Sequence, residues 1–244
     1  MGDKLSKSAT SPHRPGWTMS GSSGELGTIH SAPAETLERK PQMRRAPARR
    51  SPRLSRRVAR AFAFALQAHG TQTRKGTTIP YISHVLAVAS LVLDYGGTEN
   101  QVVAALLHDT VEDCGVTYAQ IQRQFGAPVA RIVKDCTDAE TIPKPPWKAR
   151  KQRYIDHLRH GHHAPSLLVS AADKLHNARA IVHDVKHQGK AVWRRFHAGP
   201  DEILWYYQSL CAIFRRRAKE VSPAFRLLVQ ELDGTVKEMK ALAG

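Results

Sequence analysis

Apolar residues recur at helical spacing from about residue 55 onward. Val58, Phe62, Ala65 and Leu66 form one stripe that ends near His69-Gly70, and such spacing is typical of an amphipathic helix. A loop with Gly, Thr and Pro follows up to Tyr81. We then expect helices at 84–95, from Thr98 through to Gly115, on both sides of Phe125-Gly126, and at 147–159, 167–187 (one helix or two), 200–219 and 222–242. No segment alternates in the manner of a strand, so we expect an all-α helical bundle.

The first 53 residues show no such periodicity and are rich in Ser, Pro, Gly and Arg. We therefore expect a disordered tail at 1–53, a main domain at 54–220, and a C-terminal helix at 221–244 that packs on the domain or lies at its periphery. Residues 1–57 hold 12 of the 37 Lys and Arg but only 4 of the 21 Asp and Glu, so half of the net charge of +16 lies there. The tail could contact nucleic acid, but we favour a solvated tail.

Composition excludes several classes of protein. No run of about 18 apolar residues predicts a membrane span, and the N-terminus shows no apolar segment typical of a secretory signal. The three cysteines, Cys114, Cys136 and Cys211, are odd in number and far apart. They indicate neither a disulfide framework nor a cysteine zinc site, so we expect a cytoplasmic protein.

The segment from His108 to Asp113 reads His-Asp-Thr-Val-Glu-Asp and directly follows an apolar run at 102–107. On a helix, His108 would lie one turn from Glu112, and Asp109 one turn from Asp113. Three carboxylates and an imidazole are costly to bury unpaired beside a core. A bound metal ion is the simplest compensation, and it is the one that we expect.

Three further polar segments are candidates for chemistry. Arg74-Lys75 lies in the loop before Tyr81 and His84, and Asp173 and Asn177 lie one turn apart on one expected helix. The third is basic and includes Lys148, Arg150, Lys151 and Arg153; either it is a solvated helix face or some of it contacts a polyphosphate substrate. We expect Trp147 and Tyr154 to pack, with base stacking as the alternative.

The remaining histidines are less informative. His160, His162 and His163 surround Gly161 in an expected turn without acidic neighbours, so we expect them to be solvated rather than to bind a second metal. For His176 we expect a packing role or support of the metal ligands.

Taken in order, these segments resemble the HD phosphohydrolase superfamily, and within it the ppGpp hydrolase domain of the RelA/SpoT family and the stand-alone small alarmone hydrolases. The resemblance covers roughly residues 55–215. The matching residues are His69-x-x-Gln72-x-Arg74-Lys75-Gly76, Pro80-Tyr81-x-x-His84, Leu107-His108-Asp109-x-x-Glu112-Asp113, Phe125-Gly126 and Asp173-Lys174-Leu175-His176-Asn177. Lys174 departs from the Arg of many members, and no residues can be matched to guanine recognition.

The resemblance implies a site and an activity. His84, His108, Asp109 and Asp173 would bind one divalent metal, Mn²⁺ in the alarmone hydrolases. Glu112, Asp113 and Asn177 would be catalytic. The substrate-binding residues would be Arg74, Lys75 and Tyr81 and, from the basic helix, Lys148, Arg150, Lys151 and Arg153. The substrate would be ppGpp or pppGpp, cleaved to GDP or GTP and pyrophosphate.

Two other hypotheses stay open. The chain could be an HD phosphohydrolase that acts on another nucleotide or phosphoester. It could also be a basic binding protein that keeps the fold without turnover, although such a protein would have no need of Glu112 and Asp113.

Overall fold

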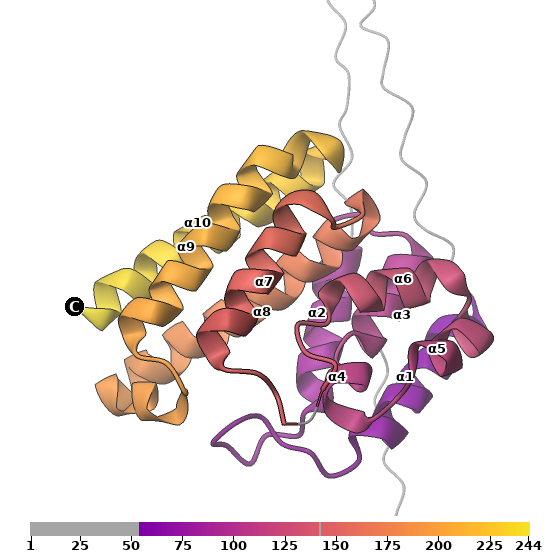
Figure 1. Ribbon diagram of the computed structural model, residues 1–244, viewed down its shortest axis with the longest axis horizontal. Coiled ribbons are helices and arrows are strands. Elements are labelled where there is room, and N and C mark those ends of the chain that lie inside the picture. The colour runs from indigo at the N-terminus through magenta and orange to yellow at the C-terminus, as the bar shows by residue number, and fades with distance from the viewer. Residues whose placement is uncertain (1–53, 142) are drawn as a thin grey trace, which may run out of the picture. The chain divides into compact units, whose positions relative to one another are not determined.

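The computed structural model describes residues 54–141 and 143–244. Every regular element in that part is a helix (Figure 1). The only strand-type pairing there is an isolated bridge between Thr73 and Pro80. The all-α class is therefore confirmed. The helices are α1 (Arg56–His69), α2 (Ile82–Asp94), α3 (Glu99–Leu107), α4 (Thr110–Cys114), α5 (Tyr118–Phe125), α6 (Ala127–Cys136), α7 (Trp147–His160), α8 (Ala164–Gln188), α9 (Pro200–Arg217) and α10 (Pro223–Ala243), with short 3₁₀ turns η1 (Gly189–Arg195) and η2 (Ala218–Glu220).

Two buried helices, α3 and α8, organise the core. Every residue of α3 from Gln101 to Leu107 is buried, and so is the α8 stretch from Ser166 to Leu175. Helices that are apolar on all sides need neighbours on all sides. Helices α1, α2 and α6 pack around α3, while α2, α6 and α10 pack around α8.

Local signals set several helix boundaries as expected. Thr117 and Gln120 form a capping box at the start of α5, and Gly126 separates α5 from α6 with a φ of 90°. The stretch expected as one helix or two is the single helix α8. These features follow from the short-range chemistry of caps and glycine.

The C-terminal helix α10 packs on α8 and α9 (Figure 1). Leu228, Leu232 and Met239 are fully buried in the same hydrophobic core as α3. Ion pairs join Glu231 of α10 to Arg179 of α8, and Glu238 to Lys186. The expected domain boundary at residue 220 stays a prediction, and the expected tail at 1–53 lies outside the described residues.

No helix in the described ranges combines the length and the apolar character that a membrane span needs.

The turn between α2 and α3 leaves no room for a side chain at Gly97. A Cβ there would lie 2.4 Å from Cγ1 of Val92 and 2.7 Å from its carbonyl oxygen. We expect Gly97→Ala to lower the free energy of unfolding by about 1–3 kcal/mol, as overpacking of a core does. Urea unfolding followed by circular dichroism measures this.

Gly234, inside α10, is the matched control, because a Cβ there would meet no atom within 4 Å. Gly234→Ala should stabilise the protein by roughly 0.5–1 kcal/mol, since Ala is the better helix former. Equal effects of the two substitutions would contradict the packing at Gly97.

Candidate active site

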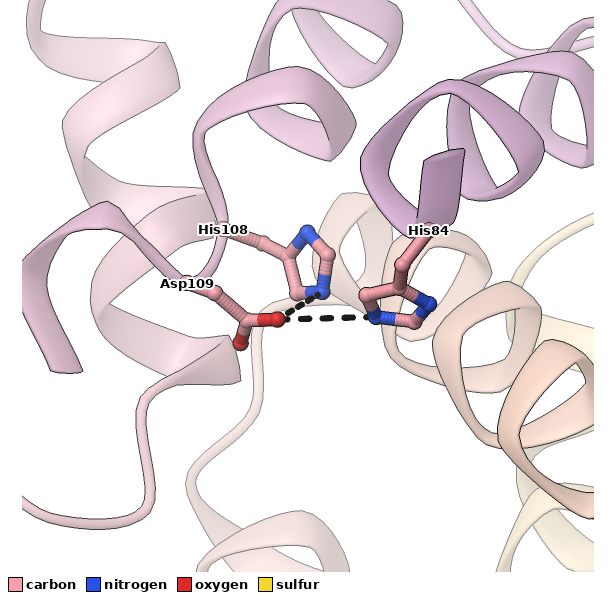
Figure 2. A group of neighbouring side chains, drawn as sticks. All are labelled: His84, His108 and Asp109. Atoms are coloured by element: carbon pink, nitrogen blue, oxygen red, sulfur yellow. Dashed lines mark ion pairs between the residues drawn. The ribbon is translucent and has the colours of Figure 1, made fainter. Parts of the chain in front are cut away.

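Three helical segments bring the four expected metal ligands together. His84 lies in the first turn of α2, His108 and Asp109 lie between α3 and α4, and Asp173 lies midway along α8. In Figure 2 the imidazoles of His84 and His108 and the carboxylate of Asp109 point toward one another. These three side chains offer ligand atoms that all lie within 4.8 Å of one another, a possible metal site.

The helix expected from Thr98 to Gly115 is interrupted, and that prediction was wrong. Helix α3 ends at Leu107, and α4 begins at Thr110. At the break Asp109 has φ −97° and ψ −3°, outside regular helix geometry, and the Thr110 hydroxyl donates to the Leu107 carbonyl at 2.7 Å. The break lies at His108 and Asp109, the two residues whose side chains approach His84.

The distances around the two imidazoles are short. Nε2 of His108 lies 3.0 Å from Oδ2 of Asp109, and Nε2 of His84 lies 3.5 Å from the same oxygen. Oδ1 of Asp173 approaches these nitrogens to 3.2 Å for His84 and 3.7 Å for His108. Both Nε2 atoms are buried without a hydrogen-bond partner. Unpartnered buried imidazole nitrogens beside two carboxylates are a donor set that could hold a divalent metal.

The charges in this cluster depend on one another. Burial by itself would lower the pKa of His108, but Asp109 and Asp173 outweigh it and hold that pKa well above its usual value. Burial would likewise raise the pKa of Asp109, yet the imidazoles of His108 and His84 hold it well below the ordinary range. For Asp173 the opposing groups are Lys174 and the same imidazoles. Both carboxylates are therefore ionised at neutral pH, the state in which a carboxylate can bind a metal ion.

Neighbouring side chains also donate hydrogen bonds to these two carboxylates. The Tyr81 hydroxyl donates to Oδ2 of Asp109 at 2.5 Å. Lys174 donates to Oδ2 of Asp173 and the Asn177 amide to its Oδ1, each at 2.5 Å. Asn177 in turn accepts from Arg74 at 2.7 Å. Tyr81, expected to bind substrate, thus contacts the expected ligand Asp109, and the side-chain amide of Asn177 uses both its NH₂ group and its oxygen.

Glu112 and Asp113 are paired with a lysine that the sequence did not single out. Nζ of Lys144 lies 2.8 Å from Glu112 and 2.9 Å from Asp113. Burial, with Asp138 and Asp109 nearby, raises the pKa of Glu112 to about 7 against the opposing effect of Lys144. Such a carboxyl can take up and release a proton near neutral pH.

A cavity of about 850 Å³ opens beside these groups. Five of the expected substrate-binding residues line it: Arg74, Lys75, Tyr81, Arg150 and Lys151. The three expected catalytic residues, Glu112, Asp113 and Asn177, line it as well. Lys144 and Arg195 also line it, although the sequence did not single them out. Lys144 stands between two prolines in a loop and Arg195 in a 3₁₀ turn, so neither had a helical pattern to mark it.

Lys148 and Arg153 do not line this cavity. Nζ of Lys148 lies 3.3 Å from the ring centre of Trp205, in a cation–π contact. Arg153 lines a separate hollow of about 310 Å³. Helical geometry explains why only two of the four basic residues of α7 line the cavity. Arg150 and Lys151 lie one turn before Tyr154 on the same face of α7, and Lys148 and Arg153 lie on other faces.

The two aromatic residues of α7 pack against the body of the protein. Tyr154 is buried, and Trp147 stands edge-on to Tyr206 with ring centres 6.0 Å apart. Neither lines the large cavity.

Comparison with known proteins assigns the family. A family model described as "HD domain" matches residues 61–204. The chain belongs to the HD-domain family. The match includes all four expected ligands, and the recognised resemblance is thereby confirmed.

Two relatives extend the comparison. Over 127 residues, which are 51% of this chain and 69% of the relative, the chain is 41% identical to a Xenopus tropicalis protein named guanosine-3′,5′-bis(diphosphate) 3′-pyrophosphohydrolase MESH1. A crystal structure of lmo0812 from Listeria monocytogenes is 33% identical with a TM-score of 0.55, and the match covers 63% of this chain and 99% of that one.

A structure titled "A metazoan ortholog of SpoT hydrolyzes ppGpp and plays a role in starvation responses" has a TM-score of 0.59 over 73% of this chain and 94% of that chain. At 24% identity it supports the HD-domain fold.

Outside the HD-domain site, the expectation that His160, His162 and His163 are all solvated was wrong for His162. Its side chain is buried, and its Nε2 lies 3.1 Å from the Ser170 hydroxyl. The backbone N–H of His163 donates to buried Asp135, which also accepts from Ser166. These contacts hold the turn before α8 against the core. His160 and His163 are exposed.

Burial of His162 makes stability depend on pH. Burial is the main cause that lowers its pKa from 6.5 to about 3. Below pH 6.5 the His162 imidazole binds a proton in the unfolded chain but stays neutral in the folded chain. The free energy of unfolding therefore decreases as the pH falls from 6.5 toward 3. His162→Gln should reduce this loss, by up to about 1.4 kcal/mol per pH unit. Urea unfolding at several pH values measures it, and His160→Gln, at an exposed site, should keep the wild-type slope.

Asp138 holds two cations of the cavity wall. Its nearly buried carboxylate pairs with Arg150 and Lys151, and these cations outweigh burial and lower its pKa to about 2. We expect Asp138→Ala to lower the free energy of unfolding by about 3–5 kcal/mol, because two largely buried charges lose their acceptor. Asp156→Ala, at an exposed pair on α7, should cost less than about 1 kcal/mol. Equal losses would show that Asp138 is not the structural acceptor.

Proposed function

We propose that this chain is a metal-dependent hydrolase that removes the 3′-pyrophosphate of guanosine 3′,5′-bis(diphosphate), ppGpp, or of pppGpp, yielding GDP or GTP and pyrophosphate. The observation that carries the proposal is the pair of unpartnered Nε2 atoms of His84 and His108, buried between two carboxylates beside a cavity lined with cations.

The proposed ligands are His84, His108, Asp109 and Asp173. Two imidazoles with two carboxylates suit Mn²⁺ or Fe²⁺ better than Ca²⁺ or Mg²⁺, which prefer oxygen ligands alone. We propose Mn²⁺, by resemblance to the alarmone hydrolases. The bound ion would lower the pKa of a coordinated water and polarise the phosphoryl group.

The proposed work of the protein groups follows from their positions. Glu112, with its raised pKa, would accept the proton of the attacking water, while Asp113 would orient that water. Arg74, held by Asn177, and Lys75 would contact phosphate oxygens. Arg150 and Lys151 add positive charge at the wall of the same cavity.

The substrate proposal is supported by the relatives and by the charge of the cavity. The Xenopus relative carries the 3′-pyrophosphohydrolase name. A guanosine polyphosphate offers several negative charges, and a cavity lined by Arg74, Lys75, Lys144, Arg150 and Lys151 complements them. Lys148 and Arg153 lie outside this cavity, so a direct role for them would require another part of the substrate.

Three earlier expectations accompany the proposal. We propose 54–220 as the hydrolase unit and a cytoplasmic location, as the cysteine content predicts. Nucleic-acid contact by the tail stays a prediction that we do not favour.

Product analysis tests the function. We expect purified protein with Mn²⁺ to convert ppGpp to GDP and pyrophosphate. Anion-exchange chromatography of the reaction mixture measures this conversion. Asp109→Ala and Asp173→Ala should each abolish turnover, because each removes a proposed ligand and leaves buried imidazoles unpaired. Asp94→Ala, at an exposed aspartate at the end of α2, is the matched control and should keep full activity.

Each contrary outcome has a distinct meaning. If ppGpp stays intact while another nucleotide is cleaved with Mn²⁺, the chain is an HD phosphohydrolase of other specificity. If no nucleotide is cleaved with any divalent ion, the chain is a binding protein. Turnover that persists in Asp109→Ala would refute the proposed ligand set.

A further inference from the structure

The two ligand imidazoles are held from behind in different ways. Nδ1 of His108 lies 2.7 Å from the carbonyl oxygen of Ala105, an ordinary backbone acceptor. Nδ1 of His84 instead lies 2.7 Å from Nδ1 of another imidazole, that of His176 on α8. The ring centres of this pair are 4.8 Å apart. A metal ligand thus depends on a side chain that a single substitution can remove.

The protonation pattern of the pair follows from its geometry. For His84 to bind a metal through Nε2, its proton must reside on Nδ1. Nδ1 then donates to Nδ1 of His176, so His176 must accept there and carry its own proton on Nε2. His84 is fully buried, and without this acceptor its N–H would have no partner, which is costly inside a protein.

The position of His176 suits such a role. It lies three residues after Asp173 on α8, so the helix that supplies one proposed ligand also supplies the partner of another. Its side chain is partly exposed and borders the large cavity. Helices α2 and α8 pack against each other, and the bond between the imidazoles joins them at the site.

We propose that His176 is a positioning residue for metal binding: its Nδ1 accepts the Nδ1–H of His84 and so fixes the tautomer and orientation in which His84 presents Nε2. This rests on the proposed metal site but not on the identity of the substrate. Outer partners of this kind typically change metal affinity by about 10–100-fold when they are removed.

Two substitutions at His176 separate the acceptor from the bulk of the ring. His176→Leu fills similar space without an acceptor. His176→Asn places an amide oxygen near the position of the histidine Nδ1. Leu is also a better helix former than Asn, so better metal binding by His176→Asn would reflect the acceptor rather than the stability of α8. His187→Leu, at an exposed histidine of the same helix, is the matched control.

Equilibrium dialysis against Mn²⁺, with protein-bound metal measured by mass spectrometry, gives the affinity without any nucleotide. We expect His176→Leu to bind Mn²⁺ about 10–100-fold more weakly than the wild type. His176→Asn should regain most of the affinity, and His187→Leu should match the wild type. Thermal unfolding in EDTA checks that the variants are folded.

The outcomes separate this inference from the proposed function. If His176→Leu binds Mn²⁺ as tightly as the wild type, or if His176→Asn is as weak as His176→Leu, the positioning role is refuted. If the wild type binds Mn²⁺ but leaves ppGpp intact, the substrate proposal fails and the role of His176 stands. If the wild type binds no divalent ion, both the proposed metal-dependent function and the positioning role of His176 are refuted.

Discussion

The structure around this site depends on the burial of ionisable groups inside an apolar helical core. His84 and His108 are almost completely buried, and Asp173 nearly so, where unpaired charge is costly. Each proposed ligand therefore has a further partner: His176 for His84, a backbone carbonyl for His108, Tyr81 for Asp109, and Lys174 with Asn177 for Asp173. Tyr81 and Asn177 donate to the same carboxylate oxygens that face the imidazoles, so a bound cation would share these oxygens with them.

The same constraint shapes the cavity. Four of its cations are paired with carboxylates: Lys144 with Glu112 and Asp113, Arg150 and Lys151 with Asp138, and Arg195 with Asp184. A ligand with one negative charge would have to compete with a carboxylate for each of these contacts. A polyphosphate offers several charges at once and can replace several pairings together. This pairing supports the proposal of a polyphosphate substrate.

Packing of distant segments makes the site rigid. The ligands come from α2, from the break between α3 and α4, and from α8, and these helices contact one another directly. Helix α8 carries Asp173, His176 and Asn177 in a single turn, and α10 covers another part of the same helix through apolar residues and ion pairs. A site built on packed helices holds its groups in place better than one built on loops alone.

The sequence by itself determined the helical class, most helix boundaries and which residue types gather at the site, because periodicity, caps and short motifs are local properties. It could not place the break at His108-Asp109, because no proline or glycine marks that point in the sequence. Nor could it show that His162 is buried, that Lys144 pairs with Glu112 and Asp113, or that Lys148 faces Trp205. Those features depend on segments that are far apart in the chain and meet only when the helices pack, and tertiary structure alone decides such contacts.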